Sequence, residues 1–183
     1  MNRTSAILGL IVLLSVAACD SQDPEPWVDA VPGIEVRNEA NSYLGRLGDP
    51  VALGPANGGV RVNAPYPNPG VGQTTFPYSV TQAGPVEVRI DRLPPTPALN
   101  QTVRSVIPGF SHGSAQVVRV YPAEPRTEGS YEFRWDGLNE AGQPAGSGYY
   151  RVTLKAGADS YTMDVIIVQS EAEMLALRAA ARR

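Results

Sequence analysis

Cysteine and histidine are almost missing from this chain of 183 residues, which has one of each, Cys19 and His112. A single cysteine cannot close an intramolecular disulfide, so the fold does not depend on a disulfide framework. Zinc centres and catalytic triads need several ligands or partners, and here most of them are absent. We therefore expect no metal site, no cofactor and no catalytic residue, and we interpret His112 as a solvated loop residue.

Positive charge is also scarce, with 15 Lys and Arg residues against 18 Asp and Glu residues and a net charge of -3. The body of the chain contains no cluster of lysine or arginine. Nucleic-acid binding requires a basic face that displaces phosphate counterions. The composition therefore predicts no nucleic-acid partner.

Long apolar runs are missing as well. The run from Ala6 to Leu14 follows Arg3 and is soon followed by the polar segment Asp20–Asp23. A transmembrane helix needs about 20 apolar residues, so this run is too short to span a bilayer. A positive residue, a short apolar centre and small residues are typical of a secretory signal peptide, which we assign to residues 1–18.

The end of this segment, Val16-Ala17-Ala18-Cys19, resembles the lipobox of bacterial lipoproteins. The resemblance implies cleavage before Cys19 and acylation of its thiol, which would anchor the protein to the inner or outer membrane of the cell envelope. A stray structural thiol is the alternative for Cys19. Residues 19–33 are rich in Asp, Glu and Pro, which favours a flexible tether.

Beyond the tether, glycine and proline are frequent, with 18 and 17 residues, and short apolar alternations dominate. In Pro85–Asp91 the residues Val86, Val88 and Ile90 share one face, as in a half-buried strand. Similar alternations occur in Ser130–Trp135, Gly148–Leu154 and Tyr161–Val168, the last of which ends apolar on both faces. The pattern predicts an all-β, Ig-like or fibronectin-like antiparallel sandwich. Its expected core includes Trp135, Phe133, Val88, Val152 and Val165.

Other segments are less regular. Thr74–Val80, Thr102–Ile107 and Gln116–Tyr121 are predicted as further strands, and Leu93–Pro97 as a stiff loop. Residues 34–63 form a lead-in in which Ile34–Arg37 and Val51–Leu53 are possible short strands.

The last residues, 170–183, have a different pattern. Ser170 and Glu173 form a capping box, with glutamates near the start and arginines near the end, which predicts a short C-terminal α-helix. Because an isolated helix of this length is marginal in water, it must dock its Met174, Leu175 and Leu177 side.

Two stretches carry a family resemblance. Ala64-Pro65-Tyr66-Pro67-Asn68-Pro69 with Thr74–Phe76, and the hairpin Trp135–Tyr150, resemble the Ig-like domain of the flagellar hook-capping protein and related C-terminal modules of surface and secreted proteins. The resemblance implies one Ig-like domain over residues 64–169, and it departs from the family between Asp91 and Glu128. In the hairpin, turn chemistry accounts for Asp136, Gly137, Asn139, Gly142 and Gly148.

Candidates for chemistry are few. Asp136, Asn139 and Glu140 offer oxygen ligands for calcium, but their spacing is not that of an EF-hand loop, and turn formation explains them better. The pattern does not bring Asp91, Glu124 and Asp164 together as a carboxylate pair. The glycine-rich Gly54–Gly59 lacks the residues of a phosphate loop. Tyr66 and Tyr149 are either a binding patch or ordinary half-buried sheet tyrosines.

We therefore expect a membrane-anchored, non-catalytic binding or structural module, held by lipid on Cys19 and serving an unidentified protein or cell-surface partner. A sorting module for type IX secretion is the alternative, although residues 170–183 extend beyond the last strand. An envelope hydrolase fits the sequence least.

Overall fold

The computed structural model describes residues 30–50 and 59–182. The expected signal peptide, Cys19, most of the tether, Val51–Leu53 and most of Gly54–Gly59 lie outside these residues. No helix within the described ranges has the length and apolarity needed to cross a membrane.

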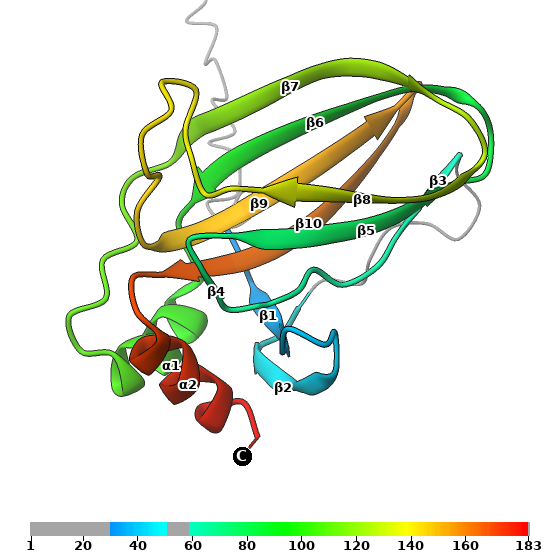
Figure 1. The fold of residues 1–183 in the computed structure, drawn as a ribbon. Coiled ribbons are helices and arrows are strands. Elements are labelled where there is room, and N and C mark those ends of the chain that lie inside the picture. The colour runs from blue at the N-terminus through cyan, green and yellow to red at the C-terminus, as the bar shows by residue number, and fades with distance from the viewer. Residues whose placement is uncertain (1–29, 51–58, 183) are drawn as a thin grey trace, which may run out of the picture.

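The elements follow one another in a mostly β chain (Figure 1). In order they are β1 (Gly33–Arg37), β2 (Tyr43–Gly48), β3 (Val60–Val62), β4 (Gly70–Val71), β5 (Thr74–Val80), β6 (Gly84–Leu93), α1 (Pro97–Val106), β7 (Gln116–Arg126), β8 (Gly129–Trp135), β9 (Gly148–Ala156), β10 (Asp159–Val168) and α2 (Glu171–Ala180).

Two sheets form the sandwich. The larger has the order β4-β10-β9-β6-β7, and the smaller has the order β3-β5-β8. All pairings within them are antiparallel except that of β4 with β10. The expected all-β sandwich with an Ig-like hairpin and a short C-terminal helix is confirmed. The smaller sheet begins at Val60, ahead of the motif at Ala64.

The first core lies between these sheets. Strand alternation turns Val88 of β6 and Val152 of β9 inward, together with Val165 of β10. Trp135 is fully buried at the end of β8, whereas Phe133 is half-buried and packs against the same core from its margin.

A second core lies on the opposite face of the larger sheet, under the β1–β2 hairpin, α1 and α2. These elements gather at one end of the sandwich (Figure 1). The buried side chains are Val31, Ile34, Val36, Leu47, Leu99, Val103, Ile107, Phe110, Tyr149, Ile166, Val168, Met174 and Leu177. Because both faces of β9 and β10 are covered here, Tyr149 and Tyr150 are both buried, and β10 ends as an apolar run. Tyr149 is therefore not part of an exposed patch.

The prediction of a strand at Thr102–Ile107 is wrong, because this segment belongs to α1 and its C-cap. Thr96 caps the helix and Pro97 occupies its first turn, where the missing N–H of proline costs nothing. Leu99 and Val103, four residues apart, dock in the second core. Leu93–Pro97 is correspondingly not a free loop: Leu93 ends β6 and Pro95 bridges to Val31.

The two ends of the module are also tied down. The last residues of the expected tether are fixed: Ala30 and Val31 are buried, and the Val31 N–H donates to Pro94 O at 2.9 Å. At α2 the capping box of Ser170 and Glu173 is present. Met174 and Leu177 dock, but Leu175 is 59% exposed, so the expected docking of Leu175 is wrong.

Candidate functional site

The hairpin between β8 and β9 uses its motif residues to hold its own shape. The Trp135 ring packs edge-on against Tyr150, with 4.8 Å between centroids, and Trp135 Nε1 donates to Leu138 O at 3.0 Å. Asn139 Oδ1 accepts from the backbone N–H groups of Ala141 and Gln143 at 3.0 and 2.9 Å. Gly137 has φ 73°, and a Cβ there would lie 2.0 Å from Gly72 O.

The oxygens that were candidate calcium ligands are occupied by protein donors. Asp136 Oδ1 accepts from the Leu138 N–H at 3.0 Å and pairs with Arg119 at 3.3 Å. A Glu140 carboxylate oxygen accepts from the Val120 N–H at 3.4 Å. Among the described residues no group of His, Cys, Asp and Glu has the arrangement of a metal site. The turn interpretation accounts for these residues.

The Tyr66–Pro69 motif joins the parts of the fold. Asn68 is fully buried; its Nδ2 donates to Asp164 O and its Oδ1 accepts from the Ile166 N–H, both at 3.1 Å. The backbones of Asn68 and Arg37 exchange hydrogen bonds of 2.8 and 3.0 Å. The motif therefore ties the β1–β2 hairpin to the edge of β10. Tyr66 is half-buried, and its hydroxyl donates to Glu132 at 2.8 Å.

His112 is half-buried on the loop between α1 and β7. Its Nδ1 lies 2.8 Å from Gly113 O, and its ring lies 6.0 Å from that of Tyr149. It lines an open hollow of about 490 Å³ together with Asn100 and Arg104. Among the described residues, no carboxylate orients the imidazole and no nucleophile is hydrogen-bonded to it.

The carboxylates Asp91, Asp164 and Glu124 do not form a catalytic pair. Asp91 and Asp164 lie on β6 and β10, on either side of Arg151 in the register of the sheet. Asp164 binds Arg151, whereas Asp91 binds Arg89. Burial raises the pKa of Asp164, and the guanidinium of Arg151 opposes this rise. Glu124 lies apart on β7 and pairs with Arg126.

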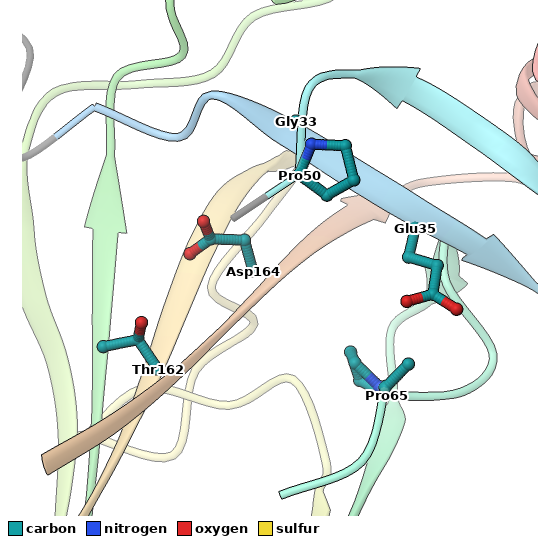
Figure 2. Close-up of a pocket in the computed structure, with 7 residues that line it drawn as sticks. Gly33, Glu35, Pro50, Pro65, Thr162 and Asp164 are labelled. Carbon is teal, nitrogen blue, oxygen red and sulfur yellow. The ribbon is translucent and has the colours of Figure 1, made fainter. Parts of the chain in front are cut away.

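A narrow cleft lies where β1 crosses β10. Figure 2 shows Glu35 near Pro65, with Thr162 and Asp164 on the neighbouring strand. Its volume of about 20 Å³ has room for about one water molecule. Glu35 is already paired with Arg37. The cleft is a polar seam between the hairpin and the sheet, and it is too small for a glycan or a peptide.

The feature with the character of a binding surface is an apolar slot at the open side of the sandwich, between β7 and β8. The slot has a volume of about 100 Å³. It is lined by Tyr78, Val86, Val88, Tyr121, Pro122, Glu124, Arg126, Glu132 and Phe133. Tyr121 and Phe133 meet edge to face across it at 4.8 Å and are both half-buried. Desolvation raises the pKa of Tyr121 and of Tyr78.

Sequence reasoning missed this slot, because strand alternation assigns Phe133 to a closed core. The composition of Gln116–Arg126 is the sequence feature that could have indicated the slot. Charged and apolar residues do not alternate cleanly there, and two prolines interrupt the strand. Of its side chains only Val118 is fully buried. Such a strand borders the sandwich without being covered by it.

A comparison with known protein families finds a match for the region around this hairpin. Residues 111–160 match the FlgD Ig-like domain. The match includes β7, β8 and β9 with the Trp135–Tyr150 hairpin, and confirms the Ig-like resemblance. The Ala64–Pro69 stretch lies outside it.

No curated protein matches the chain. Among solved structures, it is similar to dimeric latent PorU from Porphyromonas gingivalis with 16% sequence identity and a TM-score of 0.39. The aligned region covers 61% of this chain, and the chain spans 9% of the length of that structure.

Proposed function

We propose that this protein is a lipid-anchored, non-catalytic module of the cell envelope, whose Ig-like sandwich binds a partner or supports an assembly. The proposal rests on the hydrogen bonds that the motif residues make within the module. Trp135, Asn139 and Asn68 all point their polar atoms at the backbone of the module and hold its loops in place. Motif side chains that hydrogen-bond to the protein's own backbone favour a binding or structural role over a catalytic one.

The anchor rests on the sequence around Cys19. Ten residues separate Cys19 from Ala30, which is buried against the module, and a fully extended segment of this length reaches about 33–36 Å. Stable anchoring takes more than one acyl chain, because a single chain binds a bilayer only marginally. Lipid on Cys19 would therefore hold the module within a few nanometres of one membrane.

Mass spectrometry of the membrane fraction tests the anchor. The expected result is a mature protein beginning at Cys19 whose N-terminal peptide carries acyl chains. A Cys19→Ala variant should leave the membrane fraction, whereas Ser21→Ala, two residues away, should remain there. An unmodified Cys19, or a Cys19→Ala protein that still sediments with membranes, contradicts the proposal.

The absence of catalysis is tested on the purified full chain with panels of glycan, ester and peptide substrates. We expect no turnover with any of them. Turnover that disappears in His112→Ala but persists in Ser114→Ala would replace the binding role with an enzymatic one.

A further inference from the structure

The two sheets of the sandwich differ in width, and the difference leaves one strand edge open. The larger sheet has five strands and the smaller three, with β8 at the margin of the smaller one. The sheets meet at this side through Tyr121 of β7 and Phe133 of β8. Figure 1 shows β7 and β8 in different layers, joined at one end of the sandwich. The apolar slot lies between them.

The hydrogen bonds of β5 show which backbone groups of β8 are free. Thr75 exchanges both of its backbone hydrogen bonds with Tyr66, and Pro77 O accepts from the Asn63 N–H at 2.9 Å. Thr75 and Pro77 therefore face away from β8, and alternate residues of β5 bond to it. These are Phe76 and Tyr78, which lie opposite Phe133 and Tyr131.

The residues of β8 that alternate with these, Ser130, Glu132 and Arg134, direct their backbone N–H and C=O groups to the open side. Within residues 30–50 and 59–182, no backbone or side-chain group bonds to them there. The corresponding edge of β7 is protected: Glu140 bonds to Val118 O and to the Val120 N–H, and Pro122 and Pro125 lack N–H groups. In the part of the chain that the structure describes, β8 is thus an unpaired strand edge beside an apolar slot.

We propose that the open edge of β8 is a strand-addition site, which takes an extended segment of a partner protein with apolar residues at alternate positions. The free backbone groups of β8 select an extended polypeptide, because it can continue the ladder of the smaller sheet. Every second side chain of the added strand faces the larger sheet, beside Tyr131 and Phe133. The slot over Val86 and Val88 receives these apolar side chains.

In a pairing centred on Glu132, charge on β8 favours a partner strand over a second copy of this chain; a pairing centred on Phe133 would place Glu132 opposite Arg134, and the test below detects it as a dimer. In a symmetric antiparallel pairing of two β8 strands centred on Glu132, each Glu132 lies directly opposite the other. Like charges in that position are destabilising. A partner strand with threonine or another polar residue there avoids the repulsion. The site deepens the proposed binding function and does not depend on the lipid.

The test uses the full chain in detergent and a fluorescein-labelled peptide of ten residues that alternates valine and threonine. Fluorescence anisotropy measures binding. We expect saturable binding, and we expect Glu132→Pro to weaken it about ten-fold or more, because proline removes an edge N–H. Glu132→Thr keeps that N–H and should bind at least as well as the natural chain. Circular dichroism and thermal melting establish that both variants are folded.

A second arm does not depend on any variant. The same peptide, N-methylated at every second residue on its hydrogen-bonding edge, should lose binding, whereas methylation on the opposite edge should not. Amide chemical-shift changes should centre on Ser130–Arg134. Equal binding by both methylated peptides, no binding at about 1 mM peptide, or a dimer that Glu132→Pro dissolves would each overturn the proposal. Cys19→Ala should bind the peptide unchanged, so failure of the anchor and failure of this site give different results.

Discussion

Arg151 and Asp164 face each other on neighbouring strands and are joined by two charge-assisted hydrogen bonds, Nε to Oδ1 at 2.8 Å and Nη2 to Oδ2 at 2.9 Å. Their side chains are only 16% and 9% exposed. Arg151 also donates to Ala30 O at 3.4 Å, where the chain enters the module. The pair thus links the larger sheet to the N-terminal segment, close to the seam shown in Figure 2.

Replacing Asp164 with Asn should lower the free energy of unfolding by about 1–3 kcal/mol, because the largely buried guanidinium of Arg151 loses a charge-assisted hydrogen bond and the carboxylate charge beside it. Asp91→Asn is the matched control. Asp91 lies beside Arg151 on the other neighbouring strand, but it pairs with the more exposed Arg89, and its loss should cost less than about 1 kcal/mol. Urea unfolding measures both. Equal effects would show that the Arg151 pair does not support the fold.

Tyr149 and Tyr150 lie in different cores, and removing the hydroxyl group from each compares how the two cores treat the same polar group. The Tyr149 hydroxyl is buried with no partner among the described residues, and desolvation raises its pKa. The Tyr150 hydroxyl lies 2.9 Å from Ala145 O and 2.8 Å from Gly146 O and accepts from Arg92 Nε at 3.1 Å.

Tyr150→Phe should therefore destabilise the protein by about 1–3 kcal/mol, whereas Tyr149→Phe should be neutral or stabilising. Thermal unfolding of both variants gives the comparison. A Tyr149→Phe variant that loses as much stability as Tyr150→Phe would mean that the second core contains a polar partner for Tyr149.

The sequence predicts the sandwich because its strands keep a period of two where one face is covered. Val86, Val88 and Ile90 lie on the buried face of β6, as alternation requires. Tyr149 breaks the rule because a second layer covers the other face of β9. That layer is built from the short, glycine-containing strands β1 and β2 and from α1, none of which has a long apolar pattern of its own.

The prediction of a strand at Thr102–Ile107 fails for a related reason. Val103, Val106 and Ile107 are β-branched, and over six residues their spacing does not separate a strand from a helix. The N-cap residue Thr96 and the proline at position 97 are the features that indicate a helix here. The slot between β7 and β8 depends on the relative widths of two sheets, which no local pattern encodes.

Trp135→Ala should lower the free energy of unfolding by about 3–5 kcal/mol, because it empties the fully buried centre of the first core and removes the bond from Nε1 to Leu138 O. Trp135→Phe keeps the ring contact with Tyr150 and should lose less. Val117→Ala, at a side chain that is 54% exposed, should change stability by less than about 0.5 kcal/mol. A Trp135→Ala variant with the same melting temperature as the natural protein would contradict the central place of Trp135 in the first core.

Leu177 and Leu175 lie on opposite sides of α2, which allows docking of the helix to be tested without removing it. Leu177→Ala should cost about 2–5 kcal/mol, because Leu177 is fully buried in the second core. Leu175→Ala removes an exposed side chain and should leave stability within about 0.5 kcal/mol. Hydrogen exchange should show faster opening of the β1–β2 hairpin in Leu177→Ala alone. Similar exchange in both variants would separate α2 from the hairpin.

The ion pair between Glu39 and Arg178 makes a pH-dependent contribution to the free energy of unfolding. Arg178 Nη2 lies 2.7 Å from Glu39 Oε1 and joins α2 to the turn between β1 and β2; the Arg178 side chain is 8% exposed and that of Glu39 is 63% exposed. The hydrogen bond from Arg178 holds the pKa of Glu39 below its ordinary value of 4.5. The ionised carboxylate is therefore favoured by folding.

Because the folded-state pKa is the lower one, this contribution is complete above the ordinary pKa of glutamate and is lost as the pH falls through the folded-state pKa. Glu39 is well exposed, so solvent screening limits the effect to less than about 1 kcal/mol. Urea unfolding between about pH 3 and pH 6 should show a shallower loss of stability for Glu39→Gln than for the natural chain. Carbon-detected NMR titration of Glu39 should shift toward its ordinary pKa in Arg178→Met. A Glu39 pKa that Arg178→Met leaves unchanged would show that the pair does not couple α2 to the hairpin.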